Sequence, residues 1–124
     1  MTNRIKVDGI GGVFFRANDP SGLANWYLKH LGIDLVPQSE SGRPWHQEGG
    51  PTVFAPFPGD TDYFGADTSK LFMLNFRVSD LDGLITQLTA DGVDVGPVQE
   101  MPPIGRFARL YDPEGNPVEL WQPA

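Results

Sequence analysis

Glu119 is the residue of this sequence best suited to acid–base or ligand-binding chemistry. It lies in the segment Pro117-Val118-Glu119-Leu120-Trp121, where apolar and other residues alternate. This period of two predicts a β-strand with Glu119 and Trp121 on one face and Val118 and Leu120 on the other. A carboxylate beside an aromatic ring can accept hydrogen bonds or act as a general base. The more common state of a strand glutamate, exposure to solvent, is the alternative.

A tight turn joins this strand to the one before it. The turn, Asp112-Pro113-Glu114-Gly115-Asn116, combines a proline, which fixes φ, with glycine and asparagine, which tolerate positive φ. The preceding residues, 105–111, predict the first strand of this hairpin and carry Arg109. On the face of Glu119, Asn75 and Arg109 are therefore the candidate partners of its carboxylate, which we expect to be at least partly buried.

The first half of the chain predicts a strand, a helix and three further strands. Residues 11–18 alternate as a strand does, and Asp19 and Pro20 suit the N-cap and first position of a helix that Gly32 ends. Short segments separated by turns predict the remaining strands over 33–36, 44–48 and 52–57.

The second half repeats this order. Residues 72–78 predict a strand, Ser79 or Asp80 caps a helix that Gly92 ends, and residues 93–95 begin another strand.

The repeat keeps its register across the two halves. Asp80 follows Asp19 by 61 residues, and Leu84 follows Leu23 by the same interval. We therefore predict one βαβββ unit that occurs twice, although two short patterns can also coincide by chance. The predicted division is a first module over 1–57, a polar linker over 58–70 and a second module over 71–124, which together form one domain.

Composition excludes several classes of function. The chain has 124 residues, a net charge of −7 and no cysteine, so it lacks disulfides, thiolate chemistry and the basic surface that nucleic acids or anionic membranes require. No apolar run approaches the roughly 20 residues of a membrane helix, and the N-terminus lacks the apolar core of a signal peptide. We expect a cytoplasmic location and no nucleic-acid or membrane partner.

Three motifs carry a family resemblance: Asn18-Asp19-Pro20 through Leu31-Gly32, the segment 75–82, and 112–121. Together they resemble the glyoxalase / bleomycin-resistance / extradiol-dioxygenase superfamily, also called the vicinal oxygen chelate superfamily. The resemblance implies an α+β fold in which two βαβββ modules form a curved mixed sheet around a cup-shaped cavity, with the helices on the outer face. It also implies a homodimer, in some members with exchanged modules.

Metal-using members of this superfamily place His, Gln or Glu at four strand positions. The matching positions here are Gly12, Phe54, Met73 and Glu119, and only the last can bind a hard or borderline divalent ion. We therefore expect no metal cofactor. The alternative is a divalent metal bound by Glu119 with His46 and Glu48, although a polar edge-strand face is the more ordinary interpretation of His46.

The candidate ligand-binding residues face the predicted cup or carry side chains suited to a small-molecule pocket. The arginines can equally pair with carboxylates, and each aromatic residue can equally serve core packing. The set comprises Phe14, Arg16, Trp45, Phe54, Tyr63, Met73, Asn75, Arg77, Arg109 and Trp121.

Three hypotheses for function follow. The first is a metal-independent small-molecule-binding protein that holds a partly apolar ligand in the cup. The second is a metal-dependent lyase or dioxygenase that uses Glu119 with His46. The third is a metal-free enzyme that uses Glu119 as a general base.

Overall fold

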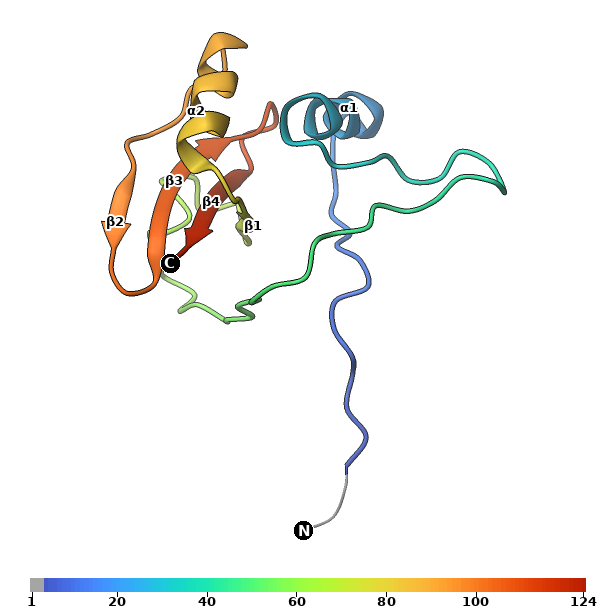
Figure 1. The fold of residues 1–124 in the computed structure, drawn as a ribbon, viewed down its shortest axis with the longest axis horizontal. Coiled ribbons are helices and arrows are strands. Elements are labelled where there is room, and N and C mark those ends of the chain that lie inside the picture. Colours follow the sequence, from blue (N-terminus) through green and yellow to red (C-terminus); the bar gives the residue numbers. More distant parts are fainter. Residues whose placement is uncertain (1–3) are drawn as a thin grey trace.

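Residues 4–124 are described by a computed structural model, in which the second half of the chain forms a strand, a helix and three further strands (Figure 1). The elements are α1 (Pro20–Leu31), β1 (Leu74–Arg77), α2 (Leu81–Ala90), β2 (Gln99–Met101), β3 (Gly105–Tyr111) and β4 (Pro117–Pro123). The α+β class predicted from the sequence is confirmed.

The sheet has the order β1-β4-β3-β2. β1 runs parallel to β4, whereas β4 with β3 and β3 with β2 are antiparallel. In this register Glu119 lies opposite Asn75 on one side and opposite Arg109 on the other. The topology thus places three polar side chains in a row across the sheet.

The opposite face of the sheet forms the core with the two helices. Val118 and Leu120 are fully buried, and they pack with the apolar stripes of the helices, which contribute Leu23, Tyr27, Leu81 and Leu88. The predicted alternation is therefore confirmed in β4. Burial of such aliphatic side chains supplies most of the stability, at about 1.5–3 kcal/mol each.

The helix boundaries follow the predicted caps. The Asp19 side chain accepts a hydrogen bond from the backbone N–H of Gly22 at 3.1 Å, and Gly32 ends α1 with φ of 71°. Asp80, not Ser79, caps α2 by accepting from the N–H of Gly83 at 2.9 Å.

The closing hairpin also attaches α1 to the sheet. The Tyr27 hydroxyl donates to the buried carboxylate of Asp112 at 2.7 Å, and Asn116 donates to the same oxygen at 2.8 Å. The Glu114 carboxylate accepts from the backbone N–H groups of Asn18 and Asp19 at 2.7 and 2.9 Å. One turn therefore anchors both the start and the middle of α1.

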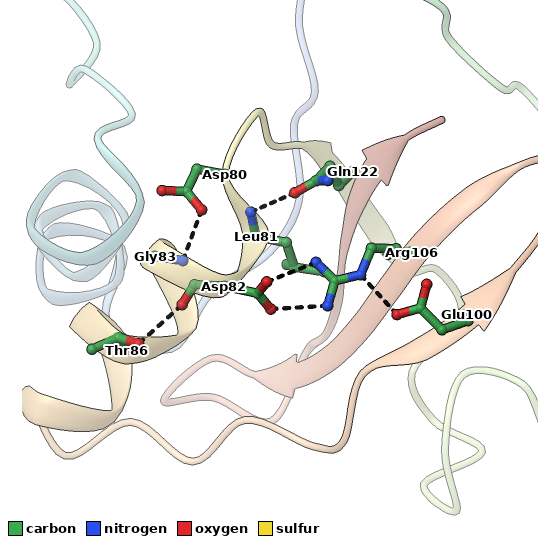
Figure 2. Close-up of polar contacts among 8 residues, drawn as sticks. All are labelled: Asp80, Leu81, Asp82, Gly83, Thr86, Glu100, Arg106 and Gln122. Atoms are coloured by element: carbon green, nitrogen blue, oxygen red, sulfur yellow. Dashed lines mark hydrogen bonds and ion pairs between the residues drawn. The ribbon is translucent and has the colours of Figure 1, made fainter.

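A surface network attaches α2 to the other end of the sheet (Figure 2). Arg106 on β3 donates to both carboxylate oxygens of Asp82 and, through Nε, to Glu100 at 2.8 Å. The backbone N–H of Leu81 donates to the side-chain carbonyl of Gln122 at 2.8 Å. These contacts fix the N-terminus of α2 over β3 and β4.

The first half of the chain differs from its predicted strands. The segments 11–18, 33–36, 44–48 and 52–57 are irregular, and Figure 1 shows the blue and green parts of the chain extending away from the sheet. Apolar side chains on them are exposed, with Phe14 at 95% and Phe54 at 84%. A strand requires a hydrogen-bonding neighbour, and none of these segments has one among residues 4–124. One chain therefore forms a curved four-stranded sheet rather than a closed eight-stranded cup.

The second half departs from prediction only at its edges. The strand expected to begin at residues 93–95 begins instead at Gln99. Before it, the N–H of Gly96 donates a single hydrogen bond to the carbonyl of Arg109 at 2.8 Å. No helix within residues 4–124 has the length and apolar character needed to cross a membrane.

Candidate functional site

Glu119 lies at the centre of the polar face of the sheet and is only 7% exposed. Its Oε1 accepts a hydrogen bond from Nδ2 of Asn75 at 2.8 Å, and its Oε2 accepts one from the hydroxyl of Tyr63. The predictions that Glu119 is buried and that Asn75 is its partner are confirmed. Both carboxylate oxygens are therefore held by neutral donors.

Tyr63 reaches Glu119 from the polar segment between the two halves. Two consecutive turns shape this segment, closed by the N–H of Thr61 on Pro58 and by the N–H of Gly65 on Asp62, each at 3.0 Å. Gly65 has φ of +108°, and a Cβ there would lie 2.6 Å from the Tyr111 hydroxyl. Glycine thus lets the segment lie directly against β3.

Arg109 lies beside the Tyr63 ring. Its guanidinium carbon is 4.9 Å from the ring centroid, a cation–π distance. Its Nε is buried and has no hydrogen-bond partner among the described residues, and the ion pairs found there do not include Arg109 with Glu119. Among residues 4–124, Arg109 therefore carries a buried donor without a partner, at the strand position opposite Glu119.

Aromatic side chains form the walls around this polar centre. Trp121 stacks on Phe107 with centroids 6.0 Å apart, and its indole N–H donates to the carbonyl of Ile104 at 3.2 Å. The Tyr63 ring stacks on Phe57 with centroids 5.6 Å apart. Aromatic rings thus border the row of Asn75, Glu119 and Arg109, and the polar residues Arg77 and Gln99 lie in the neighbouring row, opposite Trp121 and Phe107.

Burial raises the pKa of Tyr63, and the hydrogen bond to Glu119 and the charge of that carboxylate raise it further, while Arg109 opposes them. The phenol therefore stays protonated at neutral pH and donates to Glu119.

The cavity at this site is small. It has a volume of about 80 Å³ and is lined by Arg109, Glu119 and residues of β2, β3 and the preceding loop: Gly96, Pro97, Gln99, Phe107 and Ala108. Drug-sized ligands occupy roughly 300–1,000 Å³. A larger hollow of about 260 Å³ lies at the C-terminal edge of the sheet, beside Arg106, and does not include Glu119.

Several predicted site residues lie away from Glu119. Phe14, Arg16, Trp45 and Phe54 are exposed on the unpaired first half of the chain.

Two others lie at the start and end of β1. Met73 is half-buried immediately before the strand. Arg77 donates through Nη2 to the carbonyl of Glu48 at 3.0 Å, and its guanidinium packs against Gly50. Arg77 thus holds the segment 48–50 near the sheet.

The two histidines occupy different environments. His46 is exposed, with Nδ1 3.0 Å from the carbonyl of Pro44. His30 is buried, and its Nδ1 lies 3.5 Å from a carboxylate oxygen of Asp91. Among residues 4–124, no three His, Cys, Asp or Glu side chains are grouped as metal ligands. His46, Glu48 and Glu119 therefore do not come together as such a group within this part of the chain.

Sequence reasoning did not identify Phe57 and Phe107 as walls, nor Tyr63 as a hydrogen-bond partner of Glu119. The turn residues around Tyr63 indicated only a loop. For Phe107, the period of two in the hairpin was a usable signal, because it places this residue on the face of Arg109.

Comparison with known proteins agrees with this geometry. A profile of the glyoxalase-like domain family matches residues 12–121. Among solved structures, the chain is similar to TnmS3, an antibiotic binding protein from Streptomyces sp. CB03234, with 24% identity, a TM-score of 0.66, and coverage of 98% of this chain and 100% of that one.

Further structural relatives share the fold at similar identity. A glyoxylase/bleomycin resistance protein/dioxygenase domain from Frankia sp. EAN1pec is 22% identical, with a TM-score of 0.59 and coverage of 96% of this chain and 100% of that one. TioX from Micromonospora sp. ML1 is also 22% identical, with a TM-score of 0.53 over 87% and 90% of the two chains. Curated proteins give no significant match. The match over residues 12–121 shows that the chain belongs to the glyoxalase-like domain family, and the solved structures show that it shares their fold.

Proposed function

We propose that this protein binds a small, partly apolar molecule on the Glu119 face of its sheet, without a metal ion. The supporting observation is the state of Glu119: a buried carboxylate whose two oxygens accept hydrogen bonds from Tyr63 and Asn75. TnmS3, which has the same fold, is described as an antibiotic binding protein. A role in binding or sequestering a small molecule is consistent with both.

The arrangement suits a ligand with a polar donor and an apolar body. Glu119 presents an acceptor, Arg109 presents an unpartnered donor, and the stacked pair Trp121 and Phe107 presents an apolar wall. A ligand that displaces the Tyr63 hydroxyl must bring a hydrogen-bond donor of its own, because Oε2 of Glu119 is otherwise left buried without a partner.

The donor set around Glu119 does not fit a divalent ion. The carboxylate is already satisfied by Tyr63 and Asn75, and Met73 at a matching position carries a thioether that suits soft ions. A Zn²⁺ site normally has three or four nitrogen, oxygen or thiolate ligands. Metal analysis of protein purified without chelator tests this proposal, because stoichiometric Mn, Fe, Ni or Zn would contradict it.

Glu119→Gln provides the direct test of ligand binding. The amide keeps the shape of the side chain but loses its charge, so we expect a ligand found by thermal-shift screening to bind at least about tenfold more weakly, the effect of losing one charge-assisted hydrogen bond. Calorimetry on the native protein, on this variant and on the exposed Glu40→Gln control measures the difference. Equal affinity in all three forms would show that Glu119 does not take part in binding the ligand.

We also propose that the protein is a homodimer. The unpaired first half exposes large apolar side chains, and β1 is an open edge of the sheet. A second copy of the chain carries segments with the same strand pattern and can pair with that edge. Light scattering is expected to give twice the chain mass of 13.6 kDa, and a value equal to the chain mass would contradict the proposal.

A further inference from the structure

The Tyr63 side chain covers the carboxylate of Glu119. This side chain lies over the polar row, with its hydroxyl on Glu119 and its ring 4.9 Å from the guanidinium carbon of Arg109 and stacked on Phe57. These contacts are those of a bound molecule: a donor group on the carboxylate and a planar ring against a cation and an aromatic surface. The cavity lined by Glu119 and Arg109 has a volume of only about 80 Å³.

The segment that carries Tyr63 is lightly attached. Its backbone hydrogen bonds join Thr61 to Pro58 and Gly65 to Asp62, so they close turns within the segment. Among the hydrogen bonds of the described residues, the Tyr63–Glu119 bond is the one that joins residues 58–65 to the sheet. Tyr63 is also 39% exposed. The side chain can therefore leave without breaking any strand pairing.

We propose that Tyr63 is an internal occupant of the ligand subsite, and that the ligand is a planar hydroxylated aromatic molecule that displaces it. The ligand hydroxyl takes the place of the Tyr63 hydroxyl on Glu119, and the ligand ring takes the place of the tyrosine ring over Arg109. This inference rests on the proposed binding function and specifies the class of ligand.

The chemistry of the subsite favours a neutral phenol over related molecules. An aryl methyl ether has no O–H to donate, so it leaves Oε2 of Glu119 without the donor that Tyr63 supplied, while Asn75 still donates to Oε1. An aryl carboxylate brings a second negative charge beside Glu119 and is repelled. A planar ring is favoured because the guanidinium of Arg109 interacts with a π face.

The test uses 2-naphthol and its methyl ether, 2-methoxynaphthalene, as probes. Calorimetry is performed on the native protein, on Tyr63→Ala and on Phe64→Ala, a control from the same segment whose ring contacts Phe57 and which is not bonded to Glu119. If Tyr63 occupies the subsite about nine-tenths of the time, its removal raises the affinity for 2-naphthol about tenfold, since the competing state is lost. Phe64→Ala is expected to change this affinity less than about twofold. Because Tyr63→Ala removes the competing side chain for either probe, recognition of the hydroxyl is measured in Tyr63→Ala itself, where 2-naphthol is expected to bind at least about tenfold more tightly than the ether.

Each other result overturns the inference. Unchanged or weaker binding of 2-naphthol to Tyr63→Ala would show that Tyr63 is a wall of the site. Equal affinity of Tyr63→Ala for the two probes would show that an apolar space, and not the hydroxyl of the probe, is recognised. In either case the proposed binding function can still hold, because it is supported by any ligand from the screen whose binding requires Glu119. The displacement of Tyr63 and the binding function can therefore fail separately.

A second measurement covers the case in which Tyr63→Ala does not fold, as judged by circular dichroism. In the native protein, saturating 2-naphthol is expected to move the Tyr63 ring resonances in an NMR spectrum toward those of a solvated tyrosine, because the ring leaves Phe57 and Arg109. Resonances that stay in place at saturation would contradict displacement.

Discussion

The two halves of this chain carry the same sequence pattern but reach different structures. In the second half, 71–124, the pattern becomes a four-stranded sheet with a buried face. In the first half, the helix forms, but the segments predicted as strands lie outside the sheet of residues 4–124, and many of their apolar side chains are exposed (Figure 1). A helix satisfies its backbone hydrogen bonds within itself, whereas a strand depends on a neighbour. The comparison shows that periodicity specifies an extended conformation, but a partner is needed to make a sheet.

The largest expected effect is a loss of unfolding free energy when the core of the second half is altered, compared with an equivalent change in the first half. Leu120→Ala removes a fully buried side chain and is expected to lower the free energy of unfolding by about 2–5 kcal/mol. Val53→Ala alters a side chain that is 74% exposed in one chain, so we expect a loss only at protein concentrations where the proposed dimer forms. Urea denaturation of both variants at two protein concentrations measures this difference. Equal losses at the lower concentration would show that the first half is buried within one chain.

A smaller effect is expected where the two halves are joined. Tyr27→Phe removes the hydroxyl that donates to the buried Asp112, and it is expected to reduce stability by about 1–3 kcal/mol because the carboxylate loses a donor. Asn116 still donates to the same carboxylate oxygen. Urea denaturation followed by tryptophan fluorescence reports the change, since Trp26 on α1 packs at 5.0 Å from the Tyr27 ring. A stability equal to that of the native protein would mean that this bond does not hold α1 in place.

The same bond predicts how stability depends on pH. Burial raises the pKa of Tyr27 well above its ordinary value of 10.0, and the hydrogen bond to Asp112 and the charge of that residue raise it further. The folded state therefore favours the protonated phenol, so this contribution is complete below pH 10 and is lost as pH rises above it. The slope of stability against pH between pH 10 and 11 should be shallower in Tyr27→Phe. An unchanged slope would show that the stability lost above pH 10 depends on other groups, among them Tyr63.

The smallest effect is expected at the surface network shown in Figure 2. Arg106→Gln removes the ion pairs with Asp82 and Glu100, which lie in solvent and are screened by salt. We expect a smaller change in melting temperature than for either substitution above, and one that shrinks further in 0.5 M NaCl, where the Debye length is roughly 4 Å. A loss that is large and independent of salt would indicate that Arg106 acts through packing.

Residues on regular elements of the second half could be placed from the sequence. Glu119 was assigned to the polar face because Val118 and Leu120 alternate with it, and Asn75 was assigned as a partner because it shares that face. Both assignments are confirmed by the structure. In each case the period of two along one strand decides on which face of the sheet the side chain lies.

Other features depend on information that local patterns do not contain. Tyr63 reaches Glu119 across 56 residues of sequence, from a segment whose path is set by two turns and by the contact of Gly65 with Tyr111. A loop has no period that predicts where its side chains point. Likewise, the first-half segments could be predicted as extended, but their pairing depends on a neighbour that one chain does not provide.

The attachment of α1 to the closing hairpin has a consequence for folding during synthesis. Glu114 bonds to the backbone of Asn18 across 96 residues, and Asp112 bonds to Tyr27 across 85. Because the ribosome produces the chain from its N-terminus, α1 emerges long before the residues that hold it. An isolated helix of 12 residues is marginal in water, so α1 is expected to gain lasting order only after residues 112–116 have been synthesised. Contacts of such high sequence separation also slow folding, which leaves the apolar first half open to chaperones in the meantime.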